Sequence, residues 1–428
     1  MAVAPGSYAI SRRAIWSRPS FQLGVGLLVA VLLPWAVRVN LAVAELDWPG
    51  LQNSLAGTIF ALAAGYFGFR RLSRYPGVRA AYNILPTFAA SYGLVLAIFF
   101  FARLDYSRLH FSVSFLLCIF WYYVVYFHLR RQRLRIGFIP AGDAGRLTAI
   151  PEVIWVDLSR HDVAGAELDL IVADLRADLG ESWERFLADR ALDGTLVMHV
   201  KQMEESLTGR VAIEHLSENT LGSLIPAVVY ARIKRIADLL AAAIALPLLA
   251  PFGLLIALAI RLDTRGPVFF RQQRMGYRGY PFRMIKFRTM NVGIENEAGQ
   301  DPRLALMTGE EDLRVTRVGR FLRRYRLDEL PQIINVLKGE MSWIGPRPEA
   351  IPLSHWYQSE LPFYRYRHIV RPGITGWAQL KQGHVSDVDE VLEKLHYDFY
   401  YIKNFSFWLD LLILAGTIRI ILSGYGAR

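Results

Sequence analysis

Long apolar runs constrain the fold of this chain more than any other feature of its sequence. Four of them lie within the first 130 residues, at 21–37, 55–69, 84–101 and 111–127. The second run is short, yet all four approach the roughly 20 residues that a bilayer-spanning helix needs. The whole chain is 53% hydrophobic and 13% aromatic, which is too apolar for an ordinary soluble protein. We therefore expect a four-helix transmembrane region over residues 1–130.

The charges that flank these runs predict their orientation. Arginines precede the first run, separate the second from the third and follow the fourth: Arg12, Arg13, Arg18, Arg70, Arg71, Arg74, Arg79, Arg130, Arg131, Arg133 and Arg135. The other two connections are poorer in net positive charge. Basic connections stay on the cytoplasmic side of a membrane. The N-terminus and everything after Arg130 should therefore face the cytoplasm.

The overall charge narrows the range of partners. Lysine and arginine outnumber aspartate and glutamate by 49 to 38, which favours lipid head groups or phosphates. Nucleic acid is not expected, because the basic residues lie beside apolar segments. The only cysteine, Cys118, lies inside an apolar run, so the sequence offers neither a disulfide framework nor a cysteine-based metal site.

After the fourth run, the pattern changes to short β-type segments separated by polar helical ones. Strands are predicted at 135–139, 153–158, 168–173 and 195–200, and a helix at 181–192. This alternation is typical of a small α/β domain, which we place at 131–222. The turn at 140–145 lacks the G-x-G-x-x-G spacing of a dinucleotide site, so a structural or regulatory module is favoured.

A further apolar run, 236–260, contains Pro247 and Pro251. One interpretation is a fifth transmembrane helix. However, basic residues flank both of its ends: Arg232, Lys234, Arg235, Arg261, Arg265, Arg271 and Arg274. Positive charge at both ends predicts that both ends are cytoplasmic. Because proline removes a backbone donor and crowds the preceding turn, a re-entrant segment at about 234–262 is favoured.

Four arginines and two carboxylates gather in the segment 320–332, where Asp328 and Glu329 stand just before Pro331. Proline is tolerated in the first turn of a helix and aspartate is a good N-cap, so Asp328 is predicted to begin a helix that runs to about residue 337. Gly339 should end that helix. Taken alone, the segment favours a plain helix cap beside a solvated basic face.

Two strands are predicted upstream of this segment, at 266–272 and 281–290, joined around Gly276 and Gly279. Lys286 and Arg288 stand two residues apart on the second strand, so their side chains should project from one face. Such a pair is either solvated or a phosphate site. The segment that follows, 291–312, is polar and is predicted to be a surface loop.

Turn-rich segments follow downstream. Arg347 lies between Pro346 and Pro348, which stiffen its backbone. A stiff mounting suits a side chain that contacts a ligand, although a rigid surface loop is the alternative. The last apolar run, 405–422, carries Asp410 and Arg419, so an interfacial amphipathic helix is favoured over another span.

Several of these segments carry specific motifs: Gly266-Pro-Val-Phe-Phe-Arg-Gln272, Lys286-Phe-Arg-Thr-Met290, Arg326-Leu-Asp-Glu-Leu-Pro-Gln332, Ile344-Gly-Pro-Arg-Pro348 and Arg371-Pro-Gly-Ile-Thr-Gly376. With them, the chain resembles the bacterial sugar transferase family of polyprenol-phosphate hexose-1-phosphate transferases, the large monotopic phosphoglycosyl transferases. The resemblance covers essentially the whole chain in layout and is dense over 234–424. It implies four N-terminal spans, a Rossmann-like cytoplasmic domain at 131–222, and an α/β catalytic domain at 223–428 held by the re-entrant helix.

The resemblance also implies a mechanism. Asp328 of an Asp-Glu pair would attack a UDP-sugar, giving a covalent aspartyl phosphosugar and free UMP. Undecaprenyl phosphate would then accept the hexose 1-phosphate, with Glu329 as a base or a metal ligand. Carboxylates are reasonable phosphoryl acceptors, and two half-reactions let a soluble donor and a lipid acceptor use one site in turn.

An anionic nucleophile that approaches a diphosphate needs its charge cancelled. Mg²⁺ is the expected cofactor, with Asp328 as its protein ligand. The expected phosphate-binding cations are Lys286, Arg288, Arg314, Arg323, Arg326 and Arg347. Together with the nearby helix N-terminus, these cations are expected to keep Asp328 ionised.

Two motifs depart from the family pattern. Ala250-Pro251 stands where Ser-Pro is common, so Pro247 is expected to help maintain the bend. Asp312-Leu-Arg-Val-Thr316 replaces Asp-Pro-Arg-x-Thr, which leaves Arg314 in place.

The predicted function is the first membrane step in the synthesis of an exopolysaccharide, capsule or O-antigen, at the cytoplasmic face of the bacterial inner membrane. The resemblance gives UDP-glucose a mild preference, with UDP-galactose as the alternative. Expected partners are the bilayer, downstream glycosyltransferases and, as an option, a second copy of the chain. Two rivals stay open: a glycosyltransferase that releases UDP, and a non-catalytic membrane scaffold or regulator.

Overall fold

The computed structural model describes residues 15–40, 47–76, 80–130, 134–151, 153–159, 168–213, 226–291, 314–382 and 388–423. The chain divides into two compact units, Met1–Gly209 and Arg210–Arg428. The predicted surface loop at 291–312 lies outside the described residues except for Asn291, and so does the domain boundary predicted at residue 222.

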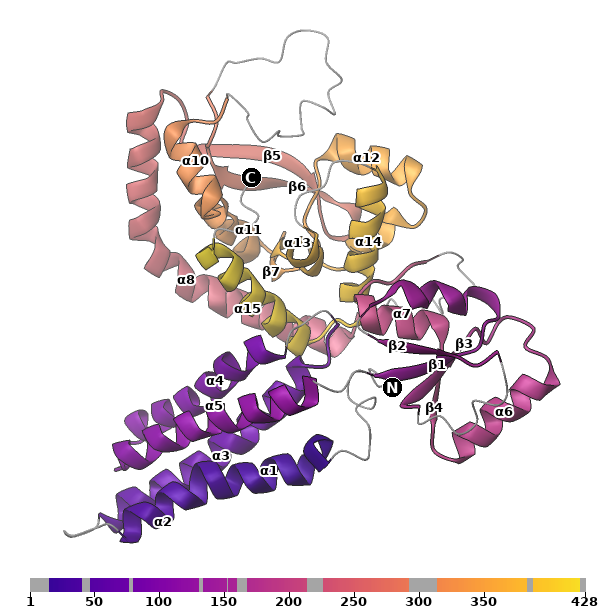
Figure 1. Ribbon diagram of the computed structural model, residues 1–428. Coiled ribbons are helices and arrows are strands. Elements are labelled where there is room, and N and C mark those ends of the chain that lie inside the picture. The colour runs from indigo at the N-terminus through magenta and orange to yellow at the C-terminus, as the bar shows by residue number, and fades with distance from the viewer. Residues whose placement is uncertain are drawn as a thin grey trace. The chain divides into compact units, whose positions relative to one another are not determined.

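The first unit begins with a bundle of long helices (Figure 1). Their bounds are Pro19–Leu27 for α1, Leu33–Asn40 for α2, Trp48–Leu72 for α3, Ala81–Phe101 for α4 and Arg108–Arg130 for α5, with a 3-10 turn at Ile15–Ser17 and a π-helical turn at Leu28–Leu32. The π-helical turn joins α1 to α2 without a break, so Pro19–Asn40 is one helical stretch of 22 residues.

Four helical stretches of the described chain are long and apolar enough to cross a membrane: Pro19–Asn40, Ala81–Phe101, Arg108–Leu129 and Val228–Asp263. The first three match predicted N-terminal spans. The other predicted N-terminal span corresponds to α3, which has 25 residues but is less apolar, because its first turns carry Gln52 and Asn53. α3 still packs in the bundle, since Leu62 and Tyr66 belong to the bundle core. The chain is therefore a membrane protein.

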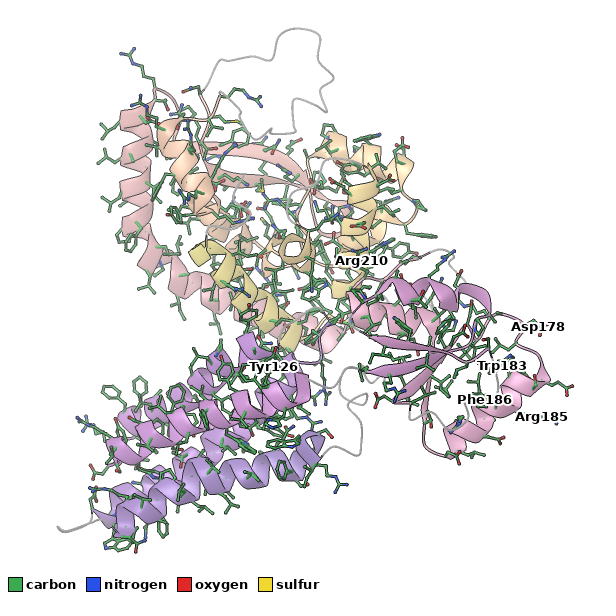
Figure 2. The ribbon with its side chains drawn as sticks, viewed as in Figure 1. Tyr126, Asp178, Trp183, Arg185, Phe186 and Arg210 are labelled. Atoms are coloured by element: carbon green, nitrogen blue, oxygen red, sulfur yellow. The ribbon has the colours of Figure 1, made fainter. Side chains whose placement is uncertain are left out.

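The rest of the first unit is a parallel sheet with the strand order β2-β1-β3-β4. The strands are β1 Arg135–Phe138, β2 Ile154–Asp157, β3 Leu170–Ala173 and β4 Leu196–His199, and the helices are a 3-10 helix at Gly142–Ala149, α6 Glu181–Leu192 and α7 Val200–Thr208. All four predicted strands and the predicted helix at 181–192 are confirmed. Trp183 and Phe186 lie on α6 (Figure 2), and both pack against the core cluster that contains Ile171 of β3.

The turn after β1 is closed by a carboxylate of the protein itself. Asp174, at the end of β3, accepts a hydrogen bond from the backbone N–H of Asp143 at 3.1 Å. Gly142 has a φ of 57°, and a Cβ atom there would overlap the same Asp174 carboxylate. A dinucleotide phosphate would need such backbone amides for itself. The geometry agrees with the interpretation of this turn as structural or regulatory.

The second unit contains α8, Val228–Asp263, a 36-residue helix that includes Pro247 and Pro251. The ribbon of α8 changes direction partway along its length (Figure 1). Straight, the helix would be about 54 Å long. Instead, both halves pack on the same unit, with Ala242 in a core cluster with Met284 and Ile260 in a second cluster with Phe287.

Two small sheets follow α8. β5 (Phe269–Met275) and β6 (Pro281–Phe287) form an antiparallel hairpin, which confirms the two strands predicted around Gly276 and Gly279. β7 (Ser342–Ile344) and β8 (Gly373–Thr375) pair in parallel. The helices are α10 Arg317–Arg324, α11 Ile333–Lys338, α12 Ile351–Glu360, α13 Trp377–Lys381, α14 Val388–Lys403 and α15 Phe407–Ser423, with 3-10 turns η7 Tyr277–Gly279, η8 Leu327–Gln332 and η9 Tyr364–Ile369.

Charged side chains tie the ends of the second unit to its body. Arg210, labelled in Figure 2, donates to Tyr397 and Glu393 of α14 at 3.0 and 3.1 Å. Asp410 of α15 is one of the two charges that favoured an interfacial helix over a span in the sequence. Asp410 is buried and pairs with Lys234 of α8 at 2.7 Å, because a buried carboxylate needs a cationic or hydrogen-bonding partner.

Candidate active site

Asp328 and Glu329 lie in η8, which runs directly into α11. α11 is followed by Gly339, whose φ is 86°. Gly339 thus ends the helix as predicted. The prediction of Asp328 as the N-cap is wrong: Arg326 holds that position, with a φ of 54°, and no side chain caps the helix. The backbone N–H of Glu329 instead donates to the carbonyl of Arg326, at 3.3 Å. The Asp328 carboxylate is therefore not used for capping.

Lys286 and Arg347 converge on the carboxylate pair. The Lys286 ammonium lies 3.0 Å from Glu329 Oε1 and 3.9 Å from Asp328 Oδ2. The Arg347 guanidinium lies 2.9 Å from the same Glu329 oxygen. All four side chains are largely buried, with Glu329 the least exposed at 8%. Residues far apart in the sequence therefore form one compact group of two anions and two cations.

The two carboxylates differ in their electrostatic environments. Burial alone would raise the pKa of Glu329, yet Arg347 and Lys286 hold that pKa well below its ordinary value. Burial raises the pKa of Asp328, and the Glu329 charge adds to the rise, while Lys286 opposes it. The net effect is a raised pKa for Asp328, opposite in direction to the stabilisation of its ionised form that the motif predicted. Glu329, held as an anion, is a poor proton acceptor in this arrangement.

Hydrogen bonds from two other arginines hold the backbone around Arg347, in addition to its two flanking prolines. Arg367 donates to the backbone carbonyl of Arg347 at 2.9 Å, and Arg274 donates to the carbonyl of Pro348 at 3.0 Å. Arg367 is itself paired with buried Asp398 at 2.8 Å. Sequence reasoning missed Arg274, Arg367 and Asp398 as supports, because no local pattern shows which carbonyl a distant arginine will reach.

The glycines of two motifs allow the backbones around Arg347 to approach each other. β7 lies beside β8, with Ser342 opposite Gly373. A Cβ atom on Gly345 would overlap the carbonyl oxygen of Arg371, and one on Gly373 would overlap the backbone N of Gly345. The Gly-Pro-Arg-Pro turn can therefore start directly from β7 and direct Arg347 toward Glu329.

The other predicted phosphate-binding arginines are placed differently. Arg288 donates to the carbonyls of Thr264 and Arg265 at 2.9 and 2.7 Å, so it stabilises the end of α8. Arg323 donates to Thr289 at 3.0 Å and still lowers the pKa of Asp328 through its charge.

Arg326 and Arg314 are the remaining two predicted phosphate-binding cations. The charge of Arg326 lowers the pKa of Glu329, so this guanidinium acts on the carboxylate pair. Arg314 accepts a hydrogen bond from the backbone N–H of Asn291 through its own carbonyl, at 2.9 Å. Of the predicted cations, Lys286 and Arg347 contact the carboxylate pair directly.

The site fits Mg²⁺ only if the substrate supplies further oxygen ligands. In the described part of the chain, no group of three His, Cys, Asp or Glu side chains could hold a metal by itself. Mg²⁺ commonly binds through one or two carboxylates together with substrate phosphates and water. Asp328 suits that role, because its closest described ionic partner, Lys286, lies 3.9 Å away.

Comparison with known proteins places these residues in a family. A family model described as bacterial sugar transferase matches residues 229–424. A UDP-N-acetylgalactosamine-undecaprenyl-phosphate N-acetylgalactosaminephosphotransferase from Aeromonas hydrophila is 45% identical over 418 residues, which are 97% of this chain and 97% of the relative. This chain belongs to the bacterial sugar transferase family.

Other members of the bacterial sugar transferase family match a shorter stretch. UDP-glucose:undecaprenyl-phosphate glucose-1-phosphate transferases from Escherichia coli (strain K12) and Caulobacter vibrioides are each 42% identical, over 188 and 204 residues. These matches cover 44% and 47% of this chain, and 39% and 74% of the relatives. The family region at 229–424 begins in α8 and contains every residue of the candidate site.

Proposed function

We propose that this bacterial sugar transferase moves a sugar 1-phosphate from a UDP-sugar to undecaprenyl phosphate and releases UMP. The observation that carries the proposal is the 45% identity along 97% of both chains with a relative named for that class of reaction. The grouping of Asp328, Glu329, Lys286 and Arg347 inside the family region supports it, because phosphoryl transfer depends mainly on positioning and charge stabilisation.

In the first half-reaction, an Asp328 oxygen attacks the phosphorus that carries the sugar. A new bond forms between that oxygen and phosphorus, the phosphoanhydride bond breaks, and UMP leaves with the electron pair. In the second, a phosphate oxygen of undecaprenyl phosphate attacks the same phosphorus, and Asp328 is released as a carboxylate. Asp328 is the nucleophile of the first half-reaction and the leaving group of the second, so only its ionised form starts the reaction.

Lys286, Arg347 and Glu329 prepare the site for the diphosphate. Glu329 lies between the two cations and offsets part of their mutual repulsion, so both can stay close to Asp328. Their remaining N–H groups are donors for phosphate oxygens. In this proposal Glu329 is a positioning anion rather than a base, because its low pKa makes it a weak proton acceptor.

Mg²⁺ belongs to the proposal as the cofactor. Asp328 would hold it, and the bound ion would neutralise charge on the diphosphate and favour the ionised carboxylate. The raised pKa of Asp328 supports a need for such a cation beyond Lys286.

The same proposal places the second unit on the cytoplasmic membrane face, with α8 as a re-entrant helix. The two halves of α8 pack on one body while middle residues such as Phe252 and Leu254 are 61% and 72% exposed. Exposed apolar side chains on a helix suit a lipid environment. A lipid-linked phosphate keeps its tail in the bilayer, so a site held at the surface meets the acceptor there.

UDP-N-acetylgalactosamine is the donor we propose. The relative that matches along 97% of this chain is named for this sugar, whereas the UDP-glucose relatives described above match over 44% and 47% of it. The full-length match therefore shifts the expected donor away from UDP-glucose.

A donor screen tests the proposed function. Purified full-length chain would be mixed with undecaprenyl phosphate, Mg²⁺ and UDP-N-acetylgalactosamine, UDP-glucose or UDP-galactose, and the nucleotide product identified. We expect UMP, formed fastest from UDP-N-acetylgalactosamine. UDP as product would indicate a glycosyltransferase, and no nucleotide product from any UDP-sugar would favour the scaffold.

A further inference from the structure

The second unit has a cleft outside the candidate active site. It lies against the N-terminal half of α8. Its polar lining comes from Lys234, Arg235, Asp238, Tyr277, Ser342 and Arg371. We call it the Arg235–Arg371 cleft.

The cations of this cleft are unequally neutralised. Lys234 lies 2.7 Å from Asp410 and 3.8 Å from Asp238, so its charge is balanced. Arg235 and Arg371 form no ion pair with a carboxylate in the described part of the chain. The two guanidiniums nevertheless share a neighbour: Arg371 donates to the carbonyl of Gly339 at 3.1 Å, and a Cβ atom on Gly339 would lie 3.2 Å from Arg235.

A structural role explains part of this arrangement. Arg235 donates to the carbonyls of Val336 and Leu337 at 2.7 and 3.3 Å, so both arginines satisfy carbonyls at the end of α11. Each guanidinium has five N–H donors, however, and those bonds use two from Arg235 and one from Arg371. The remaining donors belong to two like charges that line a cleft. Repulsion between them is relieved by an anion bound between them.

The cleft is separate from the carboxylate pair. Tyr277, whose ring stacks against Arg371 at 4.9 Å, lies in the turn of the β5–β6 hairpin. Lys286 lies near the other end of β6, opposite Phe270. Lys286 is the fifth residue after Pro281 on this extended strand, about 17 Å farther along it. Neither the carboxylate pair nor Lys286 or Arg347 lines the cleft, so an anion bound there would be held by other residues than the reacting diphosphate.

The position of the cleft on α8 points to the membrane surface, if α8 is inserted as proposed above. Lys234 and Asp238 are four residues apart and share the cleft face of the helix. Ile233, Ile236 and Leu240 lie on the opposite face and are 58%, 60% and 60% exposed. If these side chains lie in lipid, the cleft on the other face of α8 is about one helix diameter, roughly 10 Å, farther from the centre of the bilayer. That distance places the cleft at the level of the head groups.

We propose that the Arg235–Arg371 cleft binds a phosphate group at a second anion site of this protein. Guanidinium forks bind phosphate oxygens through paired hydrogen bonds, and Tyr277 fixes one of the forks. Either the head group of an anionic phospholipid or a free phosphate could supply the group. Only the assignment to a lipid rests on the proposed membrane function.

The test measures thermal stabilisation of the purified full-length chain in a neutral detergent at constant ionic strength. One arm adds inorganic phosphate, the other dihexanoyl phosphatidylglycerol, with dihexanoyl phosphatidylcholine as the zwitterionic comparison. Arg371→Gln removes one of the two guanidinium groups. Ala231→Leu fills the cleft but leaves in place the hydrogen bonds from both arginines to the end of α11. Arg365→Gln, an exposed arginine on η9, is the matched control.

We expect the half-saturating concentration of the stabilising probe to rise about tenfold or more in Arg371→Gln and Ala231→Leu, and to stay unchanged in Arg365→Gln. Stabilisation by phosphatidylglycerol alone assigns the site to a lipid head group, and stabilisation by both probes assigns it to any phosphate. The proposal would be overturned if both cleft variants had the same half-saturating probe concentration as the parent protein. That result would show that the arginines only cap α11, even if Arg371→Gln had a lower melting temperature. UMP release, measured in parallel, reports separately on the proposed function.

Discussion

The ammonium of Lys286 lies 3.0 Å from Glu329 and 3.9 Å from Asp328, so one cation on β6 contacts both carboxylates of the candidate active site. Arg347 adds a second cation on the Glu329 side. Burial and the charge of Glu329 raise the pKa of Asp328, whereas Arg347 and Lys286 hold the pKa of Glu329 below its ordinary value. Such a separation assigns different roles to two neighbouring carboxyl groups.

The pH dependence of UMP release should follow from Asp328. A nucleophilic carboxylate must be ionised, and the pKa of Asp328 is raised, so the acid limb of kcat/KM should lie above the ordinary Asp value of about 3.9. Lys286→Met removes the cation that most opposes this rise. The acid limb should then move to still higher pH, with kcat/KM at neutral pH reduced about tenfold or more.

The matched control for this prediction is Lys338→Gln, which removes an exposed lysine of α11. Its pH profile should match that of the parent protein. An acid limb that stays in place in Lys286→Met would show that Lys286 does not control the ionisation of the nucleophile.

The Glu329–Arg347 pair should contribute to stability as well as to activity. Arg347→Gln leaves a buried carboxylate with Lys286 as its remaining cationic contact, and breaking a buried pair costs about 3–5 kcal/mol. Glu329→Gln together with Arg347→Gln should recover part of that loss, because neither charge is then buried alone. Denaturant unfolding of the single and double variants measures the coupling, and strictly additive losses would contradict it.

The close approach of β7 and β8 can be tested by adding single methyl groups. Gly345→Ala and Gly373→Ala should each destabilise the second unit by about 1–3 kcal/mol and reduce UMP release, because the new Cβ atom overlaps backbone atoms. In Gly253→Ala, inside α8, the nearest atom, on Phe287, would be 3.8 Å away, so stability should stay the same or rise, because alanine favours a helix more than glycine does. Equal melting temperatures for all three variants would show that the strands lie farther apart.

If α8 is re-entrant, the turn of the β5–β6 hairpin that follows it should lie on the cytoplasmic side of the membrane. Since Cys118 is the only cysteine, a Cys118→Ser background lets a single cysteine be placed at Gly279. We expect this cysteine to react with a membrane-impermeant reagent only after the cytoplasmic face is opened. Reaction in intact spheroplasts, from the periplasmic side, would instead make α8 a full span.

Elements with a strong local signal were predicted well from the sequence. The strands at 135–139 and 168–173, the hairpin around Gly276 and Gly279, and the end of α11 at Gly339 all depend on nearby residues. Helix starts were less certain: η8 begins at Leu327, because Arg326 takes a left-handed conformation that no sequence pattern announced.

The candidate site was predictable in its members but not in its contacts. Lys286 and Arg347 reach the carboxylates, whereas Arg288 stabilises the end of α8 and Asp410 pairs with Lys234. These outcomes depend on long-range packing, which decides whether a charge in a motif is buried with a partner or faces a substrate.

The measurement that tests the central claim most directly is the fate of phosphate from UDP-N-acetylgalactosamine labelled at the phosphate next to the sugar. Without undecaprenyl phosphate, the parent protein should release UMP once per active site and retain the label on Asp328 of the chain. Asp328→Asn should retain no label and lose UMP release roughly a thousandfold or more, while remaining folded. Label retained by Asp328→Asn, or unlabelled parent protein with unchanged turnover, would contradict the account.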